Sequence, residues 1–208
     1  MNNYSQNLDK NSANYIPLSP LTFLERVKDV YPDYDSLIYG NRHYTWKQTY
    51  NRCIQFASAL EKQGIGIGDT VSILAANTPE LFEAHYSVPM TGAVINTINI
   101  RLDSHTITYI LEHSDAKLFI VDTQFSPIIK RSLQQITKKI LIIDIIDNQA
   151  LLKEGEGEQL GQWTYEDFLK QGDINYKWKR PEDEWQAISL SYTSGTTGQP
   201  KGVVYHHR

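Results

Sequence analysis

Short apolar segments alternate with amphipathic segments of helix length through the middle of the chain, and this alternation constrains the fold more than any other feature. The apolar segments have the four to five residues of a buried strand, and the intervening segments carry apolar residues at helical spacing. In chain order the expected elements are strand 71–75, helix 79–90, strand 93–96, helix 104–113, strand 117–121, helix 125–135 and strand 140–143. This rhythm predicts an α/β fold, with a layered, mainly parallel sheet flanked by helices.

Threonine side chains mark three expected helix starts outside this core. Thr22, three residues before Glu25, has the spacing of a capping box and predicts a helix that runs to about residue 30. Thr45 follows a short predicted hairpin and should cap the next helix, and Thr164 should cap a short helix that begins directly after it.

Composition and charge exclude several classes of function. The chain has 20 basic and 24 acidic residues, and no run of Lys or Arg exceeds two, so a nucleic-acid-binding surface is not indicated. No apolar run approaches the roughly 20 residues of a membrane-spanning helix, and residues 1–13 lack the pattern of a secretory signal. The single cysteine, Cys53, excludes an internal disulfide and lies on the apolar face of a predicted helix. We expect a soluble, cytoplasmic protein with a small-molecule partner.

The residues that carry chemistry follow a predicted apolar strand at residues 187–190. From Tyr192 to Gly202 the sequence reads Tyr-Thr-Ser-Gly-Thr-Thr-Gly-Gln-Pro-Lys-Gly. Gly195 and Gly198 let the backbone approach a ligand closely, so that successive N–H groups can converge on phosphate oxygens. Side chains add hydroxyl donors and one mobile cation: Thr193, Ser194, Thr196, Thr197 and Lys201. This set of groups suits a polyphosphate.

A flexible surface turn is the alternative explanation, because Gly, Ser, Thr and Pro are what any loop contains. An isolated Gly-Thr-Thr-Gly would favour that alternative, whereas an ordered run of eleven residues after an apolar strand favours phosphate binding. The run is not a Walker loop, since only two residues separate Gly195 from Gly198 and Pro200 precedes the lysine. We expect residues 193–202 to join two strands, the second at 203–205, and to pack poorly without ligand.

Other polar residues have simpler explanations than catalysis or metal binding. Adjacent residues on a strand point to opposite faces, so His206 and His207 cannot both bind one metal, and no carboxylate or cysteine stands at ligand spacing. Arg101 and Asp103 are expected to anchor a loop to the start of a helix. The sequence therefore indicates no metal ligand, and we assign no catalytic residue.

The run from Tyr192 to Gly202 resembles the signature loop of the adenylate-forming (AMP-binding) superfamily, which includes acyl- and aryl-CoA synthetases, luciferases and the adenylation domains of peptide synthetases. The resemblance extends over residues 44–60, 66–79 and 92–103, and the wording at residues 99–102 and 203–208 is most similar to enzymes of short- and medium-chain carboxylic acids. It implies that residues 16–208 form an incomplete N-terminal domain of such an enzyme. Residues 1–15 are expected to be a disordered or loosely attached lead.

By this resemblance, the β- and γ-phosphates of ATP are surrounded by six residues, with Lys201 assisting charge neutralisation: Thr193, Ser194, Gly195, Thr196, Thr197 and Gly198. The family joins a carboxylic acid to ATP with Mg²⁺, releasing pyrophosphate, and the thiol of CoA then displaces AMP from the acyl-adenylate. The acyl pocket, the adenine and ribose contacts and the C-terminal catalytic lysine of the family follow this loop in sequence. The resemblance thus implies a fragment of an acyl-CoA synthetase that is inactive alone.

Three hypotheses remain open from the sequence. The first is this fatty-acid–CoA ligase fragment, which is either the product of a truncated ancestral gene or an incomplete sequence. The second is a standalone nucleotide-binding module, or one part of a split ligase with a separately encoded C-terminal remainder. The third is an unrelated P-loop phosphotransferase, which the spacing of the glycines disfavours.

Overall fold

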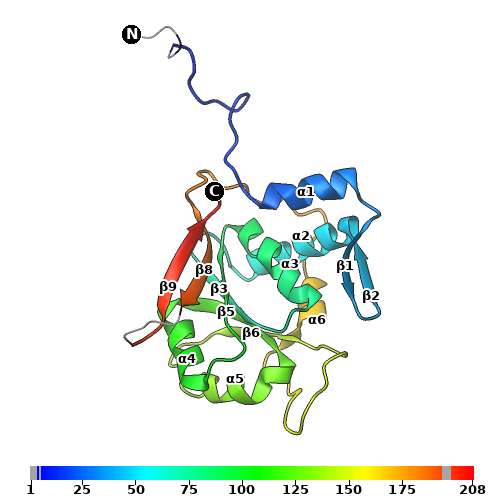
Figure 1. Cartoon of the computed structure of the whole chain (residues 1–208), viewed down its shortest axis with the longest axis vertical. Coiled ribbons are helices and arrows are strands. Elements are labelled where there is room, and N and C mark those ends of the chain that lie inside the picture. Colours follow the sequence, from blue (N-terminus) through cyan, green and yellow to red (C-terminus); the bar gives the residue numbers. More distant parts are fainter. Residues whose placement is uncertain (1–3, 5, 194–197) are drawn as a thin grey trace.

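The structure is a computed structural model that describes residue 4, residues 6–193 and residues 198–208. In the described part of the chain, seven strands form a central sheet in the order β7-β6-β5-β3-β4-β8-β9 (Figure 1). Neighbouring strands are parallel except for the antiparallel pair β8 and β9. Their bounds are β3 Thr70–Leu74, β4 Val94–Thr97, β5 Ala116–Asp122, β6 Leu141–Ile145, β7 Trp163–Thr164, β8 Ala187–Thr193 and β9 Lys201–His206. The predicted α/β fold with a mainly parallel sheet is confirmed.

Helices cover both faces of this sheet, and a separate two-stranded hairpin lies beside α2 (Figure 1). The helices are α1 Leu21–Val30, α2 Trp46–Lys62, α3 Pro79–Ser87, α4 Ser104–His113, α5 Ser126–Leu133 and α6 Tyr165–Leu169. The hairpin consists of β1 Asp35–Tyr39 and β2 Arg42–Thr45, and two short 3-10 turns, η2 Pro89–Thr91 and η3 Thr123–Phe125, follow α3 and β5. Before α1, residues 6–15 extend away from the sheet (Figure 1).

Alternating residues of the central strands face two different hydrophobic clusters. In β5, Leu118 and Ile120 pack against a cluster that includes residues of α2, α3 and α6. Phe119 and Val121 pack against a second cluster, to which α4 and α5 contribute. Because successive side chains of a strand point to opposite faces, the two clusters occupy the two faces of the sheet. The strand is apolar on both sides, as the strands of a buried parallel sheet are.

The helices that follow β3 and β4 lie on opposite faces of the sheet. After β3 the chain enters α3, which packs in the first cluster, and after β4 it enters α4, which packs in the second. The carboxyl ends of β3 and β4 are therefore a topological switch point, where ligands of open α/β sheets bind. The candidate phosphate loop leaves β8 at this same edge, because β8 runs parallel to β4.

The capping box predicted at Thr22 is wrong. Helix α1 starts at Leu21, so Thr22 lies inside the first turn, and its hydroxyl donates to the backbone oxygen of Ser19 over 2.7 Å. Pro20 has φ near that of a helix and so starts the helix earlier than the capping motif indicates. The Ser19 hydroxyl accepts from the N–H of Leu21 over 3.2 Å.

The other helix starts agree with prediction. Thr45 forms a capping box with Gln48 at the start of α2, Thr164 accepts from the backbone N–H of Asp167 at the start of α6, and Asp103 caps α4. The expected helix 79–90 ends earlier, at Ser87, and continues as a 3-10 turn from Pro89. Among the described residues, no helix is both long and apolar enough to cross a membrane.

Candidate phosphate-binding site

The predicted phosphate loop joins two antiparallel strands, as expected. Tyr192 pairs with Gly202, and Thr193 pairs with Lys201, so this last pair forms the base of the loop. Both Thr193 and Lys201 are exposed. Strand β9 begins at Lys201, two residues earlier than predicted, which places the lysine at a fixed position in the hairpin. The backbone holds the first atoms of its side chain, while the ammonium group is free to move.

Four of the seven predicted site residues, Ser194–Thr197, lie outside the described residues. Their predicted role, and the expectation that the loop packs poorly without ligand, stay predictions. On the far side of the loop, Gly198 has φ +143°, a backbone conformation that side-chain-bearing residues rarely adopt. No described atom lies within 4 Å of the position of an added Cβ there. Gly198 is thus required by the backbone path of the loop and not by a lack of space.

A cavity of about 850 Å³ lies beside the hairpin, at the carboxyl ends of β4 and β8. It is lined by the residues that follow β4, by α4, and by both ends of the signature run: Thr97, Ile98, Asn99, Leu102, Thr106, Ile110, Ser191, Tyr192, Thr193, Gly198, Gln199 and Pro200. A volume of this order holds a small-molecule ligand. Three of the seven predicted site residues are therefore placed together: Thr193 and Gly198 line the cavity, and Lys201 lies at the base of the loop.

The lining of the cavity favours an anion. None of its described lining residues is Asp or Glu, and hydroxyl and amide groups come from residues such as Asn99, Thr106 and Ser191. Lys201, which carries a positive charge, directly follows the lining residue Pro200 in the sequence. Hydroxyl and amide groups with one lysine nearby suit a polyphosphate. The Thr106 hydroxyl is already engaged, because it donates to the Asp103 carboxylate over 2.9 Å.

Tyr192, the first residue of the signature run, is tied to a helix by its hydroxyl group. The hydroxyl lies 2.7 Å from Nδ1 of His113, the last residue of α4. Burial raises the pKa of Tyr192 to about 12, so the hydroxyl keeps its proton at physiological pH. Sequence reasoning missed this contact because 79 residues separate its partners.

The two adjacent histidines have separate surroundings. The ring of His206 lies against Trp185 in a tilted arrangement, with ring centroids 4.4 Å apart, whereas Nδ1 of His207 lies 2.9 Å from the Ser19 hydroxyl. In the part of the chain that the structure describes, no three His, Cys, Asp or Glu side chains form a group that could hold a metal ion.

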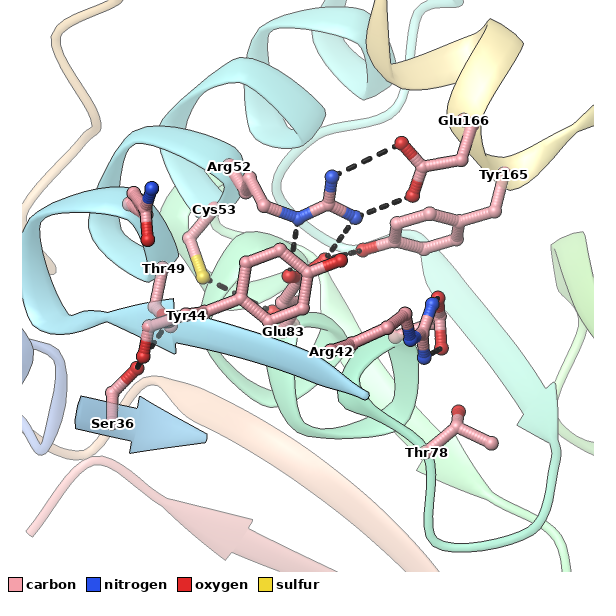
Figure 2. A network of polar contacts seen from close by, with 12 residues as sticks. Ser36, Arg42, Tyr44, Thr49, Arg52, Cys53, Thr78, Glu83, Tyr165 and Glu166 are labelled. Carbon is pink, nitrogen blue, oxygen red and sulfur yellow. Dashed lines mark hydrogen bonds and ion pairs between the residues drawn. The ribbon is translucent and has the colours of Figure 1, made fainter. Parts of the chain in front are cut away.

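A second cluster of polar residues, which the sequence did not predict, connects α2, α3 and α6 (Figure 2). Arg52 donates to Glu83 over 2.6 and 3.1 Å and to Glu166 over 3.0 and 2.6 Å. The hydroxyl of Tyr165 donates to Glu83 over 3.0 Å. Figure 2 shows the Arg52 guanidinium between the carboxylates of Glu83 and Glu166, with the Tyr165 hydroxyl directed at Glu83.

The electrostatics of this cluster indicate a structural role. Burial raises the pKa of Glu83 to about 7, while Arg52 and Tyr165 act in the opposite direction. The neighbouring Cys53 is buried in α2, as predicted, and burial raises the pKa of its thiol. The polar groups of Arg52, Glu83 and Tyr165 are directed at one another, so the cluster joins elements and offers little to a ligand.

A mainly parallel sheet, with a cavity at its carboxyl edge that is lined by both ends of the glycine-rich segment, defines an α/β domain with a candidate ligand site. The profile of the family described as AMP-binding enzyme matches residues 24–208, and the chain belongs to this family.

Several proteins with similar sequences are CoA ligases. The acetate-CoA ligase CCL3 of Humulus lupulus is 50% identical over 209 residues, which cover 97% of this chain and 37% of that protein. The acetate/butyrate-CoA ligase AAE7, peroxisomal, of Arabidopsis thaliana is 46% identical, with the same coverage. The chain thus spans about 37% of the length of the curated relatives it matches.

Solved structures agree on the fold. The anthranilate CoA ligase AuaEII in complex with anthranoyl-AMP matches with a TM-score of 0.82 and 27% identity, covering 96% of this chain and 36% of that chain. The luciferase-like enzyme of the mealworm Zophobas morio matches with a TM-score of 0.77 at 22% identity, covering 93% of this chain and 45% of that one. The chain is therefore a partial N-terminal domain of an adenylate-forming enzyme.

Proposed function

We propose that this chain provides the phosphate-binding part of an ATP-dependent acyl-CoA synthetase. The whole ligase activates a short- or medium-chain carboxylic acid through an acyl-adenylate to a CoA thioester, and the chain is inactive alone. The observation that carries the proposal is the signature hairpin, whose Thr193 and Gly198 line a cavity free of described carboxylates. The printed names of relatives, which include acetate and 2-methylpropanoate CoA ligases, support a small acid as substrate.

In the proposed reaction the hairpin stabilises charge and does not transfer protons. Attack of the acid on the α-phosphorus places growing negative charge on the departing pyrophosphate. Backbone N–H groups of the loop, the hydroxyls of Thr193, Ser194, Thr196 and Thr197, and the ammonium of Lys201 are proposed to bind that charge. Glycine at positions 195 and 198 allows the close approach of the backbone.

Mg²⁺ and CoA belong to the proposal for the whole ligase only. The described residues include no carboxylate group that fits a metal ion, so no step is assigned to Mg²⁺ here. The chain's location is also part of the proposal. Its sequence favours the cytoplasm, whereas the word peroxisomal stands in the names of some relatives, so fractionation of the source cells is the direct measurement.

A single loop supplies too little free energy for catalysis. Alignment of reacting groups contributes on the order of 7–11 kcal/mol in favourable systems. A few hydrogen bonds from one loop, at roughly 0.5–1.5 kcal/mol net each, do not replace that alignment. A chain that covers 37% of its relatives is proposed to hold the phosphates but not the adenine, ribose and acyl group.

ATP–pyrophosphate exchange with acetate, butyrate and hexanoate tests the proposal. We expect no exchange by the chain alone and measurable exchange after addition of a separately expressed C-terminal portion of a similar acetate-CoA ligase. Lys201→Ala should abolish the restored exchange, whereas Lys177→Ala, at another exposed lysine, should leave it unchanged. Exchange by the chain alone that Lys201→Ala removes would overturn the proposed inactivity.

A standalone nucleotide-binding module is the second candidate. It is supported by the pairing of β8 on both of its sides, with β4 through Ser189 and Leu190 and with β9. Tight binding of ATP to the chain alone, with no gain of exchange on adding the C-terminal portion, would favour this candidate over a severed or split ligase.

A further inference from the structure

The end of β8 that leads into the signature loop extends beyond the sheet on one side. Among the described residues, β8 pairs with β4 only through Ser189 and Leu190. The next three residues, 191–193, pair with β9 alone. On the side where β4 would continue, they line the cavity. The base of the loop is therefore held by one strand, β9, that is itself at the edge of the described sheet.

Tyr192 is the residue of this extended end that reaches back to the body of the protein. Its ring packs at the margin of the cluster formed by α4 and α5, and its hydroxyl bonds to His113 over 2.7 Å. Gly202 lies opposite it in β9, where an added Cβ would lie 3.5 Å from the ring and 3.0 Å from Cδ1 of Leu190. The tight contact of such a Cβ would be with Leu190, whereas the distance to the tyrosine ring is an ordinary van der Waals contact.

His113 is fixed in place from its other side. Its ring stacks on Tyr109, one turn earlier in α4, with ring centroids 5.3 Å apart, and meets the ring of Tyr192 edge-on at 5.7 Å. Helix α4 is in turn joined to α5, because the hydroxyl of Thr108 donates to the backbone oxygen of Ser132 over 3.1 Å. The helix that holds the tyrosine is thus a well-anchored part of the fold.

We propose that His113 is a positioning residue for the signature loop. Through Tyr192 it fixes the direction in which the β8–β9 hairpin leaves the sheet, and so the positions of Thr193, which lines the cavity, and of Lys201, its partner at the base of the loop. The same helix lines that cavity with Thr106 and Ile110, so one rigid element sets both a wall of the site and the base of its loop. That the hairpin thereby holds ATP rests on the proposed function, whereas the support of the hairpin by His113 does not.

Hydrogen–deuterium exchange of the hairpin amides tests, on the chain itself, whether His113 supports the hairpin. His113→Phe keeps a ring to stack on Tyr109 but removes the hydrogen bond, and Tyr192→Phe removes the same bond from the other side. Each variant should exchange about fivefold faster in β8 and β9, the factor expected for one net hydrogen bond. The double variant should be no faster than either single one, since both remove one interaction. His113→Gln, which keeps a polar group, should recover part of the protection.

A matched control and an activity measurement complete the test. Tyr205→Phe removes an exposed phenol from the same hairpin and should leave exchange unchanged. Unchanged exchange in His113→Phe and Tyr192→Phe, additive effects, or equally faster exchange in β5, would each overturn the proposal. ATP–pyrophosphate exchange separates the two claims: no such exchange by the wild-type chain together with the C-terminal portion would count against the proposed function, and the hydrogen–deuterium exchange would still decide the role of His113.

Discussion

Arg52 stands between two glutamates from different helices, and it is mostly buried together with Glu83. Arg52→Ala leaves the fully buried Glu83 without its cation, so we expect a loss of about 3–5 kcal/mol in the free energy of unfolding. Urea denaturation followed by circular dichroism measures this loss. Lys130→Ala breaks a half-exposed pair with Glu158 and should cost less than about 1 kcal/mol. Equal losses in the two variants would contradict the structural role of the cluster.

The protonation of Glu83 adds a pH dependence to that variant. Burial already raises the pKa of Glu83 to about 7, and removal of Arg52 raises it further. A raised pKa in the folded state means that stability is present below the unfolded value of about 4.5 and is lost as pH rises through the folded pKa. The cost of Arg52→Ala should therefore be smaller at pH 5 than at pH 8.

His207 is expected to make stability depend on pH in the opposite direction to Glu83. Burial lowers the pKa of His207 below 6.5, and its ring lies against the Ser19 hydroxyl. A lowered pKa in the folded state means that the unfolded chain binds the proton more readily, so stability present above pH 6.5 is lost as pH falls. Between pH 7.5 and 5.5, His207→Gln should lose less stability than the wild type in urea titrations. Identical pH dependence of the two proteins would contradict this assignment.

At the scale of elements, helix α2 depends on its start. Thr45 accepts from the N–H of Gln48, and the Gln48 side chain accepts from the N–H of Thr45. Thr45→Ala should lower the free energy of unfolding by about 1 kcal/mol, whereas Thr45→Ser, which keeps the hydroxyl, should stay close to wild type. Thermal and urea unfolding measure both, and an equal loss in the two variants would mean that packing of the methyl group and not capping matters.

Elements with strong local signals were predictable, and their exact ends were not. Strands such as β3 and β5 are apolar throughout and flanked by polar turns, so their type and place follow from the sequence. Helix α1 starts earlier than the Thr22–Glu25 spacing predicts, because Pro20 already has a helical φ. The early start of β9 at Lys201 depends on pairing with Thr193, which is not a local property of the sequence.

At the scale of the whole molecule, the order of the strands and the shape of the site depend on contacts between distant residues. The sequence predicts a parallel sheet but not that β8 inserts beside β4, and this insertion is what creates the cavity. The chemical nature of the loop could be predicted from its glycines, hydroxyls and lysine. The support of Tyr192 by His113 and the cluster around Arg52 could not, since their partners lie 79 and 31 residues apart.

Strand β9 leads to a prediction about the whole chain in solution. In the described sheet it is the last strand, and its Val203, Val204 and Tyr205 are exposed by 40%, 62% and 54%. An edge strand with exposed apolar side chains is a template for pairing with another chain. We expect the chain to associate at concentrations on the order of micromolar to millimolar, the range in which exposed edges aggregate.

Sedimentation velocity over that concentration range measures the association. Val204→Lys places a charge on the edge strand and should shift the chain toward monomer, because lysines on edge strands oppose pairing. Ile38→Lys, at a similarly exposed position of β1 in the separate hairpin, is the matched control and should leave the association unchanged. A constant monomer mass at every concentration, or an equal effect of the two substitutions, would show that β9 is not the contact. An association specific to Val204 would mark β9 as the contacting edge.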